Sequence, residues 1–263
     1  MPILCRTVTR HRRHPLLRWI ERKCRRFIDC IENAHNYDFD SNGEAHLLRQ
    51  LASPESRVVF DVGANVGDWA RMARRAMPAA AIHCFEVMPT TAAELRSRIG
   101  GDPGIRINEF GLSNAAGTVT LRSFEGLSPL TSLVALDHKL PFVEVEGRVV
   151  TGDAYCAEQS VAHIDLLKID VEAAEWMVMQ GLQGLLARRA VDVIQFEYGR
   201  GSIFSHFLLR DYHLLLQAHG YRVGKLYADH VEFRDYDPAH EDFLGPNFVA
   251  VRADRQELMA LLS

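Results

Sequence analysis

Residues 58–70 read Val-Val-Phe-Asp-Val-Gly-Ala-Asn-Val-Gly-Asp-Trp-Ala, and the predicted architecture starts from them. The three apolar residues at the start predict a buried strand, and the apolar spacing that begins at Trp69 predicts a helix. Between them, Gly63 and Gly67 allow a sharp turn and a close approach of the backbone to a ligand. The stretch therefore predicts the opening of a βαβ unit, with a helix N-terminus that suits a polar or anionic group.

The spacing of these glycines excludes two common nucleotide sites. The pattern Gly-x-x-x-Gly lacks the third glycine of a dinucleotide fingerprint, and no Gly-Lys-Ser/Thr of a phosphate-binding loop follows. The next predicted strand, residues 81–85, ends at Glu86, where a carboxylate can accept hydrogen bonds from both hydroxyls of a ribose. A nucleoside that carries an amino acid, S-adenosylmethionine, fits this combination.

Four sequence blocks, in this order, resemble the FkbM family of class I methyltransferases. They are Asp-Val-Gly-Ala-Asn-Val-Gly at 61–67, Phe-Glu-Val-Met-Pro at 85–89, Leu-Lys-Ile-Asp-Val-Glu-Ala-Ala-Glu at 167–175 and Phe-Glu-Tyr at 196–198. The resemblance runs from about Arg57 to Arg252. It implies a Rossmann-like fold and methyl transfer from S-adenosylmethionine, usually to a hydroxyl oxygen. One departure is Ala173, where the family usually has glycine, and this change is expected to narrow the substrate space.

The predicted fold is a doubly wound α/β domain with a mostly parallel, seven-stranded sheet and an antiparallel edge. Residues 1–52 are predicted to form a basic amphipathic helix and a connector, and residues 53–263 the methyltransferase domain. Single helices are predicted over 172–187 and 204–219, and a short extra strand over 118–121. The irregular segment 122–147 is expected to form part of the wall that binds the methyl acceptor.

The candidate site residues lie mainly at the carboxyl ends of predicted strands. Cofactor contacts are expected from Asp61, Gly63, Ala64, Asn65, Gly67, Glu86, Asn108 and Asp170. Asp170, Glu197 and His206 are the catalytic candidates. In one mechanism, Asp170 or a histidine (His206 or His230) acts as general base. In the other, Asp170 and Glu197 hold Mg²⁺, which acidifies the acceptor hydroxyl. The metal-free mechanism is preferred.

Further residues receive lesser predictions. Glu175 is expected to be structural rather than catalytic. Tyr37 and Asp38, in the polar connector, are expected near the cofactor mouth, and Tyr236 is a further residue within reach of the site.

The chain has a formal net charge of −4, which hides an asymmetry. Residues 1–26 hold nine Lys and Arg against one acid, Glu21, so the rest holds 21 basic and 33 acidic residues, a balance of −12. Residues 15–32 predict an amphipathic helix whose apolar face docks on the domain or on a second subunit as a homodimer contact. Peripheral contact with an anionic membrane is the alternative. Nucleic acid is not expected as a partner.

Five scattered cysteines without a Cys-x-x-Cys pair argue against a disulfide framework or a zinc site. No apolar run approaches the roughly twenty residues of a membrane span, and the start of the chain does not resemble a signal peptide. We therefore expect a cytoplasmic protein.

The predicted activity is O-methylation of a small molecule with a hydroxyl group, such as a sugar or natural product. Two alternatives from other classes are a catalytically inactive nucleoside-binding partner and an RNA methyltransferase that uses the basic N-terminus. The acidic body and the lack of an Asn/Asp-Pro-Pro-Tyr/Phe block speak against RNA.

Overall fold

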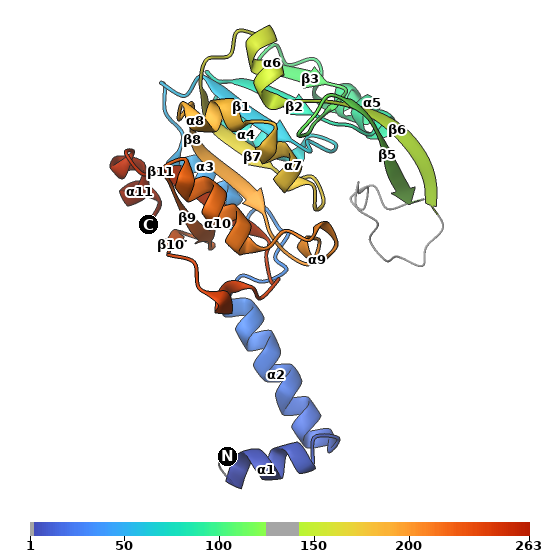
Figure 1. Ribbon diagram of the computed structural model, residues 1–263, viewed down its shortest axis with the longest axis vertical. Coiled ribbons are helices and arrows are strands. Elements are labelled where there is room, and N and C mark those ends of the chain that lie inside the picture. Colours follow the sequence, from blue (N-terminus) through green and yellow to red (C-terminus); the bar gives the residue numbers. More distant parts are fainter. Residues whose placement is uncertain (1–2, 125–141) are drawn as a thin grey trace.

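The computed structural model of the 263-residue chain describes residues 3–124 and 142–263 (Figure 1). Its helices are α1 (Ile3–Arg10), α2 (Pro15–Ile31), α3 (Glu44–Gln50), α4 (Asp68–Ala76), α5 (Pro89–Ile99), α6 (Gly152–Glu158), α7 (Glu175–Gln180), α8 (Gln183–Ala187), α9 (Ser202–Ser205), α10 (Leu209–Ala218) and α11 (Gln256–Leu262). Its strands are β1 (Val58–Val62), β2 (Ala81–Phe85), β3 (Ile105–Asn108), β4 (Gly111–Leu112), β5 (Gly117–Phe124), β6 (Phe142–Val150), β7 (Ile164–Ile169), β8 (Val191–Glu197), β9 (Tyr221–Leu226), β10 (Val231–Phe233) and β11 (Asn247–Arg252).

The main sheet has the strand order β10-β9-β11-β8-β7-β1-β2-β3. The five strands from β8 to β3 are parallel, and β11, β9 and β10 pair antiparallel at the other edge. This confirms the predicted α/β class with its antiparallel edge. The described sheet has eight strands rather than seven, because three residues after a turn, Val231–Phe233, extend the edge. The chain leaves β1 toward β2 on one side and returns as β7 on the other, which opens a ligand crevice at the carboxyl ends.

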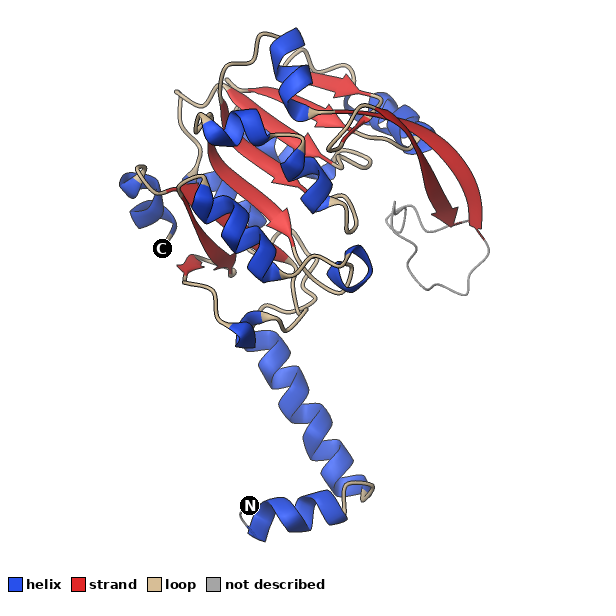
Figure 2. Ribbon diagram, in the orientation of Figure 1, coloured by secondary structure: helices blue, strands red, loops and turns tan. Residues whose placement is uncertain are grey.

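Helices cover both faces of this sheet (Figure 2). Buried side chains of α3, α4, α5 and α11 join one apolar cluster, and those of α6, α7, α8 and α10 join another on the opposite face. The strands contribute to both clusters because successive side chains point to opposite faces. Val59 of β1, for example, belongs to the first cluster and Phe60 to the second.

A second sheet, ordered β4-β6-β5, arches away from the body as a long hairpin (Figure 1). The strand predicted over 118–121 lies within β5, whereas β6 was not predicted. The two strands pair along their length, from Gly117 opposite Val149 to Phe124 opposite Phe142. Residues 125–141 of the predicted acceptor wall lie outside the described residues.

Two predicted helices are interrupted. The helix expected over 172–187 starts only at Glu175, because Glu172 and Ala173 adopt left-handed backbone angles, and it is divided into α7 and α8. The helix expected over 204–219 is divided into α9 and α10, because His206 has a φ of 63°. A left-handed residue cannot continue a right-handed helix, which explains the late start of α7 and the break between α9 and α10. Both single-helix predictions are wrong.

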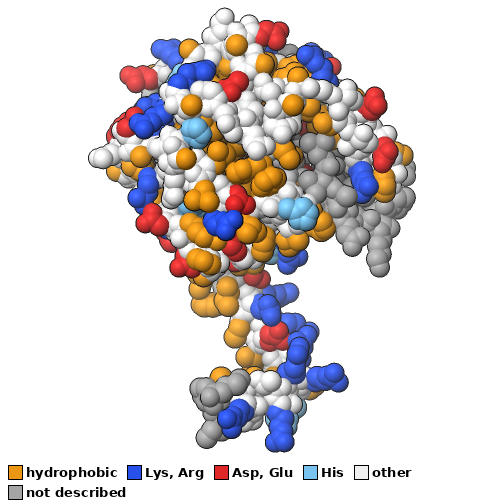
Figure 3. Space-filling view, viewed as in Figure 1, with side chains coloured by type: hydrophobic (Ala, Val, Ile, Leu, Met, Phe, Trp, Pro, Cys, Tyr) orange, Lys and Arg blue, Asp and Glu red, His pale blue; other side chains and the backbone are white. Residues whose placement is uncertain are grey.

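The predicted N-terminal helix is confirmed as α2, preceded by the unpredicted α1. Within α2, all of whose 17 residues the structure describes, no residue is buried. The helix projects from the body like a stalk, with α1 across its far end (Figures 1 and 3). The prediction that its apolar face docks on its own domain is therefore wrong. Over residues 3–124 and 142–263, none of the helices combines the length and apolar character needed to cross a lipid bilayer.

Candidate active site

A cavity of about 660 Å³ opens at the carboxyl ends of β1, β2, β7 and β8. Its volume is in the range of small-molecule and cofactor sites. The loop after β1 forms one wall, and the hairpin supplies Leu121 and Val149. Its polar and charged lining side chains are Tyr37, Asn42, Glu44, Asn65, Asp68, Glu86, Thr91, Lys168, Asp170, Glu172, Glu197 and Asn247.

The loop after β1 is shaped by two glycines in left-handed conformations. Gly63 has a φ of 83°, and a Cβ there would lie 1.8 Å from the carbonyl oxygen of Asp170. Gly67 has a φ of 90°, and a Cβ there would lie 2.7 Å from a side-chain carbon of Ile99. The first glycine lets the loop lie against the end of β7, and the second lets α4 pack against α5. The loop backbone thus lies at the cavity wall, where a ligand can approach it closely.

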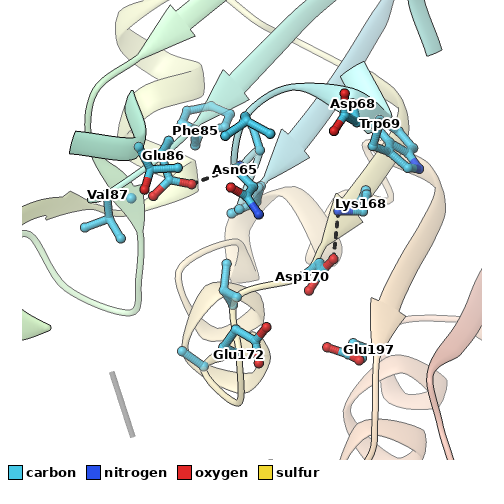
Figure 4. A pocket seen from close by; sticks show the side chains of 18 of the residues that line it. Asn65, Asp68, Trp69, Phe85, Glu86, Val87, Lys168, Asp170, Glu172 and Glu197 are labelled. Atoms are coloured by element: carbon cyan, nitrogen blue, oxygen red, sulfur yellow. Dashed lines mark hydrogen bonds and ion pairs between the residues drawn. The ribbon is translucent and has the colours of Figure 1, made fainter. Parts of the chain in front are cut away.

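Glu86 lies directly beside the same loop (Figure 4). Its carboxylate accepts hydrogen bonds from the backbone N–H of Asn65 and of Met88, both at 2.9 Å. Burial raises the pKa of Glu86, although these two bonds oppose the shift. The side-chain oxygen of Asn65 is buried and has no hydrogen-bond partner among the described residues. Glu86 and Asn65 therefore offer hydrogen-bond acceptors to a ligand that carries hydroxyl or amino groups.

A row of polar side chains crosses the sheet, and two of its members, Glu44 and Lys168, line the cavity. The parallel register places Asp61 of β1 beside Lys168 of β7, and Lys168 beside Gln195 of β8. Glu44 of α3 accepts a hydrogen bond of 2.6 Å from Gln195 Nε2. We call these four residues, Asp61, Lys168, Gln195 and Glu44, the buried polar row.

Lys168 connects this row to the cavity. Its Nζ lies 3.0 Å from Asp170 Oδ2, 3.5 Å from Asp61 Oδ1 and 5.6 Å from the centre of the Trp69 ring (Figure 4). Burial alone would lower the pKa of Lys168, but the surrounding carboxylates outweigh burial and raise it. Burial raises the pKa of Asp61 to about 6, against the attraction of Lys168. Lys168 is thus a buried cation that fixes one oxygen of Asp170.

Three acids gather on the side of the cavity opposite Glu86 (Figure 4). Asp170 directly follows β7, Glu197 is the last residue of β8, and Glu172 lies in the loop after β7. Burial raises the pKa of Glu172 to about 8, with the charges of Asp170 and Glu175 adding to the effect. Burial and the charge of Asp170 raise the pKa of Glu197 well above its ordinary value. At neutral pH this group therefore holds protons as well as negative charge.

The loop between β7 and α7 is held by Glu175. Its Oε1 accepts hydrogen bonds from the backbone N–H of Val171 at 2.9 Å and of Ala173 at 3.3 Å. This geometry supports the structural role predicted for Glu175. Ala173 has a φ of 77°, which explains why glycine is the easier residue at this position.

Several predicted site residues lie in the cavity lining and others do not. Gly63, Ala64, Asn65, Glu86, Asp170, Glu197 and Tyr37 line it, whereas the lining formed by the described residues does not include Asp61, Gly67, Asn108, Asp38, His206, His230 or Tyr236.

The residues outside the lining have other surroundings. Asp61 is fully buried beside Lys168. The side chain of Asn108 donates to the carbonyl of Cys84 at 3.0 Å, so it joins β3 to β2. His206 is exposed at the end of α9, and His230 stacks on Tyr227. Their positions do not support the predicted base roles of the two histidines.

Sequence reasoning missed Lys168, Glu172, Trp69 and Glu44. The available signal was a lysine inside the otherwise apolar strand Leu-Leu-Lys-Ile, since a buried cation needs a partner. Glu172 and Glu44 carried no such signal, because their burial depends on the backbone turn after β7 and on the packing of α3.

The strand order, the cavity at the switch point and the acid that ends β2 together define a class I methyltransferase fold with a nucleoside-type site. The chain belongs to the family of the methyltransferase FkbM domain, whose model matches residues 61–223.

Three curated relatives are similar to this chain. The 31-O-demethyl-FK506 methyltransferase FkbM of Streptomyces tacrolimicus is 30% identical over 48% of this chain and 59% of its own length. The 2-O-methyltransferase NoeI of Sinorhizobium fredii (strain NBRC 101917 / NGR234) is 25% identical over 66% of this chain and 75% of its own. The hexuronic acid methyltransferase AglP of Haloferax volcanii is 29% identical over 61% of this chain and 65% of its own length. The chain thus spans about 60% of the length of the first of these relatives.

Proposed function

We propose that the protein transfers the methyl group of S-adenosylmethionine to a hydroxyl oxygen of a small molecule. The observation that carries the proposal is a single cavity with Glu86 on one side and Asp170 with Glu197 on the other. Glu86 suits a ribose, and Asp170 with Glu197 suits an acceptor hydroxyl. Family membership and the names of two relatives, which specify O-methylation, support the same reaction.

The cofactor would lie along the loop after β1. Glu86 would accept hydrogen bonds from the ribose hydroxyls, and the buried oxygen of Asn65 would accept one from another donor group of the ligand. Gly63 and Ala64 would bring the backbone against the ligand. When bound, S-adenosylmethionine supplies an electrophilic methyl group on a sulfonium.

The acceptor would lie beside Asp170. When the acceptor hydroxyl takes up the methyl group, Asp170 would accept the proton of that hydroxyl. Because Lys168 holds Oδ2 of Asp170 at 3.0 Å, the carboxylate has a fixed orientation. Glu197, whose pKa is raised by burial and by the charge of Asp170, would contact the acceptor on the same wall. Several oxygen-bearing side chains on one wall favour a polyhydroxylated acceptor such as a sugar, in line with the hexuronic acid named for one relative.

The residues at this rim do not fit the Mg²⁺ alternative. The ammonium of Lys168 already occupies one oxygen of Asp170, where it would repel a second cation. Among the described residues, the one group of three side chains placed to hold a metal is His163, Asp165 and Asp192, at the opposite ends of β7 and β8. We therefore propose a metal-free mechanism. A cytoplasmic location remains a prediction.

A methyl-transfer screen with labelled S-adenosylmethionine over glycosides, hydroxylated natural products and RNA tests the proposal. Transfer to a hydroxyl compound is expected, and it should persist in EDTA. Asp170→Asn should bind the cofactor normally and lower turnover by roughly 10²–10⁴, whereas Glu94→Gln, an exposed carboxyl on α5, should behave like the wild type. Transfer only to RNA would refute the small-molecule acceptor. Loss of activity in EDTA that Mg²⁺ restores would refute the metal-free mechanism.

A further inference from the structure

We call α1 and α2 together the stalk. Its helix α2 leaves large apolar side chains in solvent. Leu16, Trp19, Ile20, Phe27, Ile28 and Ile31 are between 42% and 67% exposed. They belong to the same helix, and Figure 3 shows apolar side chains along one side of the stalk and Lys and Arg along the other. So many exposed apolar side chains on one segment mark a binding surface.

The stalk also carries most of the positive charge of the N-terminal segment. Residues 1–26 have a formal charge of +8, whereas the remainder has −12. Glu21 pairs with Arg18 and Arg25, at 2.7 Å and 3.2 Å, which leaves a large positive excess on the stalk. Lys23 lies over the ring of Trp19, 5.9 Å from its centre, so a basic and an aromatic side chain lie side by side on α2.

We propose that α1 and α2 dock on the surface of an anionic phospholipid membrane. The apolar side chains of α2 would enter the boundary between headgroups and acyl chains, and the Lys and Arg side chains would contact lipid phosphates. With 17 residues, α2 is about 25 Å long, and its polar face keeps it in the plane of the interface. An amphipathic helix with Trp and Phe on one face and Arg on the other is typical of such binding.

Charge favours this partner over the other occupants. A second copy docked through the same face would bring two segments of +8 together. Nucleic acid would pair with the arginines but would leave Phe27 and Ile31 in water. An anionic membrane satisfies both faces at once, because lipid offers negative headgroups above an apolar layer.

The root of the stalk is fixed to the body. Glu32 accepts hydrogen bonds from Lys225 Nζ and from the hydroxyl of Tyr227, both at 3.2 Å. The side chain of Asn33 donates to the carbonyl oxygens of Asn42 at 2.8 Å and Leu226 at 3.2 Å. Membrane docking would therefore hold the whole domain, and not a loose tail, close to the lipid surface.

The test is sedimentation of the full-length protein with vesicles of phosphatidylcholine and phosphatidylglycerol, compared with phosphatidylcholine alone. Binding is expected only to the anionic vesicles, and it should weaken strongly in high salt. Phe27→Glu should lower binding roughly tenfold or more, because it replaces an inserted ring with a charge. Each of Arg22→Gln and Arg26→Gln should lower it about fivefold.

Leu214→Glu is the matched control, because Leu214 is 59% exposed but lies on α10 of the body. It should leave vesicle binding unchanged, and all variants should keep the wild-type melting temperature. Equal binding to both kinds of vesicle, or equal losses in Phe27→Glu and Leu214→Glu, would overturn the proposal. The absence of vesicle binding would also overturn it in either of two cases. In the first, light scattering shows a dimer for the wild type and a monomer for Phe27→Glu. In the second, the protein binds RNA through the same arginines.

Discussion

Replacing Lys168 with methionine should lower the free energy of unfolding by several kcal/mol. The Lys168 side chain is 4% exposed and Asp61 is fully buried, with Nζ and Oδ1 3.5 Å apart. Methionine has a similar length but no charge, so Asp61 would lose its cationic neighbour inside the sheet. Breaking a buried ion pair from one side costs about 3–5 kcal/mol. Against a total stability of about 5–15 kcal/mol, this is a large fraction.

Urea unfolding followed by tryptophan fluorescence measures this effect at pH 7. We expect Asp61→Asn in the Lys168→Met background to restore most of the loss, because it removes the charge that was left unpaired. Lys23→Met, on the exposed face of α2, is the matched control and should change stability by less than about 0.5 kcal/mol.

The effect should also depend on pH. Burial already raises the pKa of Asp61 to about 6, and removing Lys168 would raise it further. The loss in Lys168→Met should therefore be smaller at pH 5, where Asp61 takes up a proton. A loss below about 1 kcal/mol at pH 7, or no recovery in the double variant, would refute the coupling inferred for the buried polar row.

Three further outcomes are expected. Glu86→Ala should weaken S-adenosylmethionine binding by roughly tenfold or more in calorimetric titration, because a charge-assisted pair of hydrogen bonds is lost; unchanged affinity would remove Glu86 from the site. Ala173→Gly should raise the free energy of unfolding by about 0.5–1 kcal/mol, since it relieves a φ of 77°, and a decrease would show that the loop gains nothing from glycine. Stability without ligand should fall between pH 6.5 and 8.5, because the raised pKa values of Glu175 (about 7) and Glu172 (about 8) favour the folded state only while these groups keep their protons. The buried histidines, with pKa values of about 4, are neutral in this window, so Glu172→Gln should flatten the decline seen in urea titrations.

The parts of the site that follow one strand could be predicted from the sequence. The loop from Gly63 to Asn65 and the acids Glu86, Asp170 and Glu197 each stand directly after an apolar run, and parallel strands bring their carboxyl ends to one rim. These positions depend on local pattern and on strand direction alone.

The rest depends on pairings between distant segments. Lys168 meets Asp61 only because β7 lies beside β1 in one register. The hairpin of β5 and β6 joins residues up to 32 positions apart, from Gly117 to Val149, and no short turn signal predicts it. The left-handed residues Glu172 and Ala173 delay the start of α7, and the left-handed His206 separates α9 from α10, although the apolar spacing of both segments reads as continuous. Local propensity cannot show such a break when the residue is not glycine.

The anchor at the root of the stalk has a consequence for shortening the protein. Lys225 is 1% exposed, and Glu32 is the acid that neutralises it. A chain shortened to begin at residue 33 would lack α1 and α2, and no residue of α2 is buried. It would nevertheless leave an ammonium group enclosed in the edge of the sheet without its counter-charge. The smallest version that folds well should therefore keep Glu32, with about one turn of α2 ahead of it.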